Sequence, residues 1–330
     1  MKAIVYSEYG PPSVLRLAEV EPPVLSERDV LVRVHAASIN SWDRDNLRGA
    51  FANRGMLGWR RPRVAAALGG DIAGRVEAVG PGVTRFSPGD EVFGDLSASG
   101  WGAFAELARA PEDALTRKPL GLSFEQAAAM PQAAVMALQG IRDHGDVQAG
   151  QRVLVNGAGG GVGSFAVQLA KLRGAEVTAV DASSKLEMLR GLGVDHVIDY
   201  RAQDYTRGER RYDFVLDCEL HRSVFDCLRV LAPGGKLTVV GGSIPRLLQL
   251  VTLGKLRQRL GGPQVALLMH RANADLGYLG ELAARGELRP VIEREYSLDQ
   301  VPLAMQRLCD GLIVGKAVIK IVTRNARGAA

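Results

Sequence analysis

A glycine-rich turn is the segment with the clearest chemical potential. Residues 157–163 (GAGGGVG) follow the apolar run 153–155 and precede an apolar, helix-like segment. In that context, the free N–H groups and the dipole at the start of the helix attract a pyrophosphate. A side chain at Gly160 would hold the phosphates away, and Gly163 would let the helix pack closely on the sheet. The predicted dinucleotide contacts in this turn are Gly157, Gly160, Gly161, Val162 and Gly163.

An acidic residue stands where a ribose-binding carboxylate is expected. Asp181 ends the apolar run 176–181, about 20 residues beyond the glycines, where an acid usually accepts hydrogen bonds from a ribose diol. A tight turn without a ligand is the plain alternative. A methyltransferase combines similar features, but it usually carries an acidic residue just before its glycines, where this chain has Asn156. That class would also leave the long β-rich first part of the chain without a role.

Strands and helices are expected to alternate around these residues. Strands are predicted over 152–156, 176–181, 196–199, 212–217 and 236–240, and a helix over 161–173. Alternation on this length scale predicts an α/β architecture with a parallel, doubly wound Rossmann sheet. Ser123 is expected to cap a helix over 123–137, and helix-like sequence runs from 246 to about 286.

The rest of the chain has a β character. Val30, Val32 and Val34 alternate with residues of the opposite face in a strand-like run, and Gly and Pro turns punctuate the first part of the chain. This pattern predicts a barrel-like β domain, which the β-style C-terminal tail is expected to rejoin. The chain has 330 residues, more than one hydrophobic core usually serves, so two domains are expected.

Several sequence blocks in order resemble one family. They include VLVRVHAASIN, GGDIAGRVEAVGPGVTRFSPGDEVFGDL, VLVNGAGGGVGSFAVQLAKLRGAEVTAV and the terminal GKAVI. With these blocks the chain resembles the medium-chain dehydrogenase/reductase superfamily, within it the zinc-independent quinone oxidoreductase branch (zeta-crystallin-like and reticulon-interacting-reductase-like). The resemblance implies a GroES-like β-barrel catalytic domain over 1–125, a Rossmann domain over 126–275, and a return of 276–330 to the catalytic domain. It also implies a substrate cleft between the domains.

The resemblance raises the question of zinc. Positions that match the catalytic zinc ligands of the alcohol dehydrogenase relatives are Asn40, Gly70 and a place near Gln132, none of them a good ligand. The three scattered cysteines cannot form the four-cysteine structural lobe. We therefore expect no metal. Without a Lewis acid, conjugated substrates that spread the developing charge are favoured over simple alcohols.

The resemblance implies an NAD(P)H-dependent oxidoreductase that transfers a hydride to a conjugated ketone, quinone or similar small electrophile. Asn40 is expected to donate a hydrogen bond to the substrate oxygen, Asp43 to organise the loop or relay a proton, and Trp42 to wall the pocket. These are also ordinary turn and packing residues. The tyrosine that many relatives carry in this loop is missing, so water is the expected proton source. Alternatives are an alcohol, aldehyde or enoyl-thioester oxidoreductase of the same fold, and a non-catalytic dinucleotide-binding sensor or structural protein.

The sequence gives opposing indications on whether the dinucleotide is NADH or NADPH. Asp181 favours NADH because it repels a 2′-phosphate, whereas the branch more often uses NADPH. We lean slightly toward NADPH. The positions that match a 2′-phosphate pocket are Ser183, Ser184, Lys185 and Tyr200. The positions that match the nicotinamide end are Gly241, Gly242 and Ser243, with Met136 where the family often has a threonine.

Charge and cysteine content limit the partners. The net charge of +5 comes mostly from scattered Arg, so no nucleic-acid partner is expected. Sparse cysteines and a strand-like start favour a reduced, cytoplasmic protein, and no apolar run is long enough for an integral membrane segment. A homodimer is expected from the family. The basic, amphipathic segment 246–262 is expected to be a helix that covers the cleft or contacts a subunit, with a membrane-surface helix as the alternative.

Overall fold

The computed structural model describes residues 1–49, 59–60, 62 and 68–321. The chain divides into two compact units. The first combines Met1–Gln132, Ala272–Gly286 and the described residues from Pro290 onward, and the second combines Ala133–Arg271 and Glu287–Arg289. These limits lie near the domain boundaries predicted from the sequence. The assignment of the two units as catalytic and cofactor domains stays a prediction.

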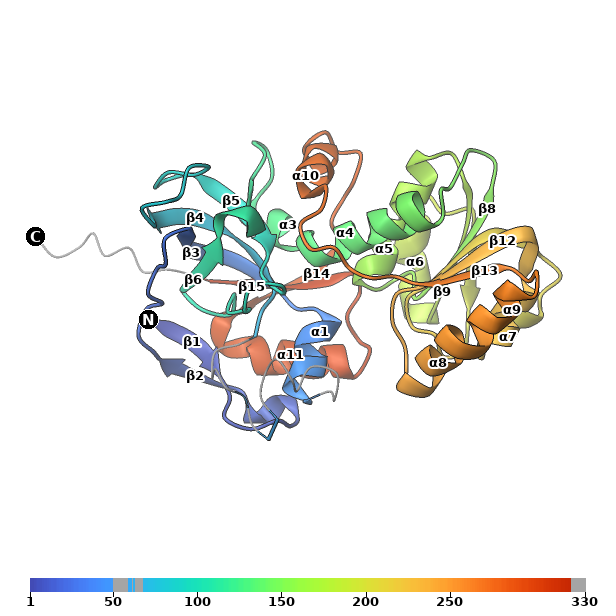
Figure 1. Cartoon of the computed structure of the whole chain (residues 1–330), viewed down its shortest axis with the longest axis horizontal. Coiled ribbons are helices and arrows are strands. Elements are labelled where there is room, and N and C mark those ends of the chain that lie inside the picture. Colours follow the sequence, from blue (N-terminus) through green and yellow to red (C-terminus); the bar gives the residue numbers. More distant parts are fainter. Residues whose placement is uncertain (50–58, 61, 63–67, 322–330) are drawn as a thin grey trace, which may run out of the picture. The chain divides into compact units, whose positions relative to one another are not determined.

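The first unit is built around strand β3 (Asp29–Ser38), whose Val30, Val32 and Val34 are fully buried, as their alternation predicts. The sheet order is β14-β15-β3-β4-β5-β7, and β6 also pairs with β3 (Figure 1). Strand β3 therefore pairs with three strands, β15, β4 and β6. The C-terminal strand β15 pairs antiparallel with β3. The other strands are β1 (Lys2–Val5), β2 (Arg16–Glu19), β4 (Asp71–Val79), β5 (Glu91–Asp95), β6 (Leu107–Pro111), β7 (Thr116–Arg117), β14 (Ile292–Ser297) and β15 (Lys316–Lys320).

Short helices complete the first unit. Ser123 caps helix α3 through a hydrogen bond from the Gln126 N–H to its side chain, as predicted. The predicted helix over 123–137 is in fact two helices, because Pro131 cannot continue the first and instead starts the second. The helices of this unit are α1 (Ser41–Leu47), α3 (Phe124–Ala128), α10 (Leu276–Ala284), α11 (Val301–Cys309) and the 3-10 turns Pro12–Val14, Glu112–Ala114 and Leu298–Gln300.

The second unit contains the predicted parallel sheet. Its strand order is β10-β9-β8-β11-β12-β13, with every neighbouring pair parallel, so the order reverses beside β8 as in a dinucleotide-binding sheet. Figure 1 shows the helices that accompany these strands. The strands are β8 (Arg152–Asn156), β9 (Glu176–Asp181), β10 (His196–Asp199), β11 (Tyr212–Asp217), β12 (Leu231–Val239) and β13 (Gln264–Leu267).

Helices connect these strands. They are α4 (Pro131–Leu138), α5 (Gly161–Leu172), α6 (Leu186–Gly191), α7 (Val224–Arg229), α8 (Ile244–Gln249) and α9 (Lys255–Arg259), with the π-helical segments η3 (Gln139–His144) and η6 (Leu250–Gly254) and the 3-10 turns η4 (Ser183–Lys185) and η5 (Tyr205–Arg207). Buried Phe165, Ala166 and Leu169 form the inner face of α5. No helix within the described residues is both long and apolar enough to cross a bilayer.

Two predictions of secondary structure are wrong. The segment expected to be helical from 246 to about 286 contains strand β13, because its four residues are too few to show a period. The β-style tail contains helix α11 between its two strands. The segment 246–262 is helical, in short pieces that expose several aliphatic side chains. These are Leu248, Val251, Leu253, Leu256 and Leu260.

Candidate active site

The glycine turn after β8 has the geometry that the sequence predicts for a phosphate cradle. Gly157 adopts φ +75°, a left-handed conformation that favours glycine, and its N–H donates to the Val180 carbonyl at 3.0 Å. A β-carbon on Gly163 would lie 2.2 Å from the Gly157 carbonyl oxygen, so the helix packs against the turn itself. A β-carbon on Gly160 would meet only that same oxygen, at 3.4 Å. The space in front of Gly160 is therefore open, at the start of the 12-residue helix α5.

Asp181 lies against this turn. Its side chain is almost fully buried; Oδ2 accepts the Gly159 N–H at 2.7 Å, and Oδ1 accepts the Ala182 N–H at 2.8 Å. The Lys185 ammonium lies 3.8 Å from Oδ1. Two N–H groups and one cation thus surround the carboxylate, which reduces the repulsion that it would exert on a nearby phosphate.

Other predicted cofactor residues gather at the carboxyl edge of the parallel sheet. The Tyr200 N–H donates to the Asp181 carbonyl at 3.3 Å, and its ring is partly exposed. Ser183 and Ser184 begin the turn η4, which Ala182 separates from Asp181. The carboxyl ends of parallel strands form the ligand-binding edge of such a sheet.

The loop after β11 lies close to both the glycine turn and the loop after β12. A β-carbon built on Gly157 would lie 3.2 Å from Cβ of Cys218, and one on Gly241 would lie 3.6 Å from the Cys218 carbonyl oxygen. Gly242 follows, and Ser243 stands at the N-cap of α8. Cys218 was not anticipated, because a lone cysteine after a strand carries no distinguishing pattern.

Met136 lies in helix α4, away in sequence from the glycine turn, and its side chain is buried. Its expected place beside the nicotinamide stays a prediction.

The loop that carries the predicted catalytic residues is in the first unit. Asn40 stands at the N-cap of α1, and its backbone N–H donates to Oδ2 of Asp43 at 2.8 Å. The other carboxylate oxygen accepts the Gly69 N–H at 2.9 Å. Burial raises the pKa of Asp43 to about 7, although both backbone bonds favour the ionised form. Asp43 ties two chain segments together, which favours the loop-organising role over the proton relay.

Trp42 follows Asn40 and is about a third exposed. Its ring lies tilted against the ring of Trp101, with the centroids 6.3 Å apart. A β-carbon on Gly70 would lie 3.3 Å from the Trp101 ring, so the Trp101 indole stands beside the Gly70 backbone. Trp42 thus packs against a tryptophan that is itself buried, and its expected place in the pocket wall stays a prediction.

A polar cluster occupies the region of the three positions that match zinc ligands. The Asp71 carboxylate, next to Gly70, accepts the Asn40 Nδ2–H at 2.9 Å and the Gln132 N–H at 2.9 Å. The Lys316 ammonium lies 3.2 Å from Asp71 Oδ2 and also contacts Asn40 Oδ1. Within the described residues, no group of three or more His, Cys, Asp or Glu is arranged to hold a metal ion.

Sequence reasoning missed Lys316 and Asp71. A signal was present, since each is a charged residue directly before a short run without charge (AVI after Lys316 and IAG after Asp71). A charge in that position is rarely buried without a partner. The partners could not be paired in advance, because the two residues are 245 positions apart.

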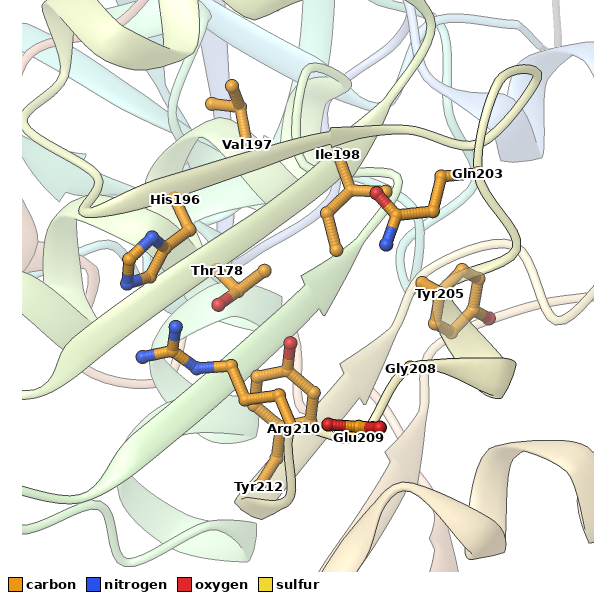
Figure 2. A pocket seen from close by; sticks show the side chains of 10 residues that line it. All are labelled: Thr178, His196, Val197, Ile198, Gln203, Tyr205, Gly208, Glu209, Arg210 and Tyr212. Carbon is orange, nitrogen blue, oxygen red and sulfur yellow. The ribbon is translucent and has the colours of Figure 1, made fainter.

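The second unit also holds a cavity of about 280 Å³ beside β9 and β10 (Figure 2). Two of its lining residues contact Glu176, since Arg210 forms an ion pair with that carboxylate and His196 Nε2 lies 3.0 Å from it. None of its lining residues belongs to the predicted cofactor set. They are Thr178, His196, Val197, Ile198, Gln203, Tyr205, Gly208, Glu209, Arg210 and Tyr212.

Comparisons with known proteins agree on one family. Residues 26–120 match the alcohol dehydrogenase GroES-like domain, and residues 192–319 match a zinc-binding dehydrogenase domain. The chain is 31% identical to the mitochondrial NAD(P)H oxidoreductase RTN4IP1 of Mus musculus, over 98% of this chain and 89% of the relative. It is 32% identical to the 2-methylene-furan-3-one reductase of Solanum lycopersicum, over 97% of this chain and 79% of the relative.

A solved structure gives the same answer. The quinone oxidoreductase from Coxiella burnetii superposes with a TM-score of 0.85 at 29% identity, covering 98% of this chain and 99% of the other.

This chain belongs to the medium-chain dehydrogenase/reductase superfamily. The recognition, the GroES-like fold and the Rossmann fold predicted from the sequence are thereby confirmed. The name of the second matched domain refers to zinc, but this medium-chain dehydrogenase/reductase has asparagine and glycine at two of the three positions where the alcohol dehydrogenase relatives have ligands.

Proposed function

We propose that the protein reduces conjugated ketones, quinones or similar small electrophiles with a reduced nicotinamide dinucleotide and without zinc. The observation that carries this proposal is the polar cluster at Asn40, where a buried ammonium and an amide stand in the region of the family's metal ligands. The names of the relatives agree, since they include a quinone oxidoreductase and a 2-methylene-furan-3-one reductase.

The residues at the carboxyl edge of the parallel sheet fit a dinucleotide. A β-carbon at Gly160 would occupy the open space that a pyrophosphate needs, and the N–H groups at the start of α5 face that space. The Asp181 carboxylate and the Lys185 ammonium would hold the adenosine ribose. When bound, the nicotinamide supplies the hydride. NADPH is slightly preferred in this proposal, because Lys185 partly neutralises Asp181.

The substrate would lie beside Asn40 and the indole of Trp42. The Asn40 amide donates a hydrogen bond to the substrate oxygen, where negative charge grows during reduction. The Asp43 carboxylate holds the loop in place by accepting hydrogen bonds from the Asn40 and Gly69 N–H groups. Water delivers the proton that completes the reduction, since the loop has no tyrosine.

The decisive experiment is a fluorescence titration with NADH and NADPH, followed by turnover with a panel of quinones, enones and alcohols. We expect binding of a reduced dinucleotide and its oxidation by quinones or enones, with no dependence on metal. Alcohol oxidation together with stoichiometric zinc would support the alcohol dehydrogenase alternative instead. Tight binding without turnover of any acceptor would support a sensor or structural role.

The remaining features follow from the family. We propose that residues 1–125 and 276–330 form the catalytic domain and residues 126–275 the cofactor domain. A homodimer is proposed because β13 is a terminal strand of its described sheet and exposed aliphatic side chains stand nearby, among them Leu260 and Met269. Light scattering after size-exclusion chromatography tests this assembly. A cytoplasmic location is proposed from the free thiols of Cys218, Cys227 and Cys309.

A further inference from the structure

A buried ammonium group meets the Asn40 side chain where three neighbouring strands end. Lys316 starts β15, Ser38 ends β3, and Asp71 starts β4, and these strands lie side by side. Lys316 is 2% exposed and Asp71 is fully buried. Burial raises the pKa of Asp71, and the Lys316 ammonium opposes this rise. Removing two charges from water is unfavourable unless their attraction and their hydrogen bonds compensate for it.

Every donor of the ammonium is used. Lys316 Nζ donates to the Ile39 carbonyl at 3.2 Å, to Asp71 Oδ2 at 3.2 Å and to Asn40 Oδ1. A lysine ammonium has three N–H donors and no acceptor. Lys316 therefore cannot bind a substrate itself without losing one of these bonds. Its effect on the reaction has to pass through the Asn40 amide.

The contacts determine which way this amide points. Its oxygen faces Lys316, which can only donate, and its Nδ2 faces the Asp71 carboxylate at 2.9 Å, which accepts. A flipped amide would set NH₂ against the ammonium and oxygen against the carboxylate. One hydrogen of Nδ2 is used by Asp71, and the second is left to donate to another group. Asn40 thus presents a donor and keeps its acceptor buried.

We propose that Lys316 is a positioning residue that locks Asn40 as a hydrogen-bond donor, so that the site selects substrates by an accepting carbonyl or quinone oxygen. This inference rests on the proposed function. The ammonium also polarises the amide, which strengthens its N–H as negative charge grows on the substrate oxygen. Oxidation of an alcohol needs an acceptor for the hydroxyl proton, and a locked donor does not supply one.

Two double variants isolate this contact. Lys316→Met by itself would leave the Asp71 charge buried and unpaired, and the protein could fail to fold. Both variants therefore carry Asp71→Asn, combined with either Lys316→Gln or Lys316→Met. Glutamine keeps an N–H that can reach Asn40 Oδ1, whereas methionine has a similar length and no donor. Melting temperature and the Kd for NADPH verify that the two proteins fold and bind alike.

With a naphthoquinone and with cyclohexenone, kcat of the methionine variant should be at least about tenfold below that of the glutamine variant, at similar Kd for NADPH. The side-chain amide signals of Asn40 in a ¹⁵N-asparagine-labelled protein should differ between the two variants, because only the glutamine variant keeps a donor to Asn40 Oδ1. Equal kcat values together with identical Asn40 signals in the two variants would overturn the proposal. If the native enzyme reduces no quinone or enone, the proposed function fails, and the Asn40 signals still decide whether Lys316 orients the amide.

Discussion

The glycine turn offers the sharpest test, because two of its glycines should fail in different ways. A β-carbon on Gly163 would lie 2.2 Å from the Gly157 carbonyl oxygen, a backbone atom that cannot rotate away. Gly163→Ala should then destabilise the second unit by about 3 kcal/mol, at the upper end of typical overpacking costs. At about 2–4 °C per kcal/mol for domains of this size, the melting temperature should fall by about 10 °C.

Gly160→Ala should weaken binding instead. Gly160 has an ordinary φ of −88°, and its added β-carbon would meet only one oxygen, at 3.4 Å. Replacing a glycine N-cap by alanine costs about 1 kcal/mol, so melting should fall by about 3 °C. The new methyl group would point into the space proposed for the pyrophosphate. We expect the Kd for NADPH to rise by about tenfold or more, equivalent to about 1.4 kcal/mol.

Gly191→Ala is the matched control. Gly191 ends helix α6, and a β-carbon there meets nothing within 4 Å. This variant should melt at or slightly above the native temperature and bind NADPH normally. Thermal melts and fluorescence titrations of the three variants decide the question. Native binding by Gly160→Ala would refute the cradle, and native melting by Gly163→Ala would refute the close packing of the turn.

Three further predictions concern single side chains and metal. Burial raises the pKa of Asp43 to about 7. Between about pH 4 and pH 7, Asp43 therefore keeps a proton in the native state that it has lost in the unfolded chain. The free energy of unfolding should then fall as pH rises through that window, by up to about 4 kcal/mol. The unfolding free energy of the native protein in urea, relative to Asp43→Asn, should decline over this range; a constant difference would contradict the assignment. Asp181→Asn should weaken NADH binding more than NADPH binding, since the lost charge served the ribose diol and opposed a 2′-phosphate; equal losses in titrations with both cofactors would count against that role. Dialysis against a chelator should leave quinone turnover unchanged, and activity that disappears and returns with added zinc would disprove a metal-free mechanism.

Local chemistry made much of this protein predictable from its sequence. The glycine turn, the strand before it and Asp181 lie within 30 residues of one another, so their spacing already specifies one βαβ unit. The alternation of Val30, Val32 and Val34 likewise specifies the buried face of β3, since side chains of a strand alternate between its two faces. In both cases the interacting residues are close in sequence, and the backbone period transmits the pattern directly.

The tertiary structure alone decided which distant residues meet. The sequence does not show that Lys316 and Asp71 are partners, and only the pairing of β15, β3 and β4 brings them against Asn40. The same pairing places the Asn40 amide oxygen against the Lys316 ammonium, a contact that the sequence did not show. The sequence did not predict strand β13 for a related reason. Its four residues are too few to show a hydrophobic period, and its pairing with β12 at the edge of the sheet is a tertiary contact. The periodicity of hydrophobic residues depends on residues that are close along the chain, whereas burial and charge pairing depend on how the strands are arranged in space.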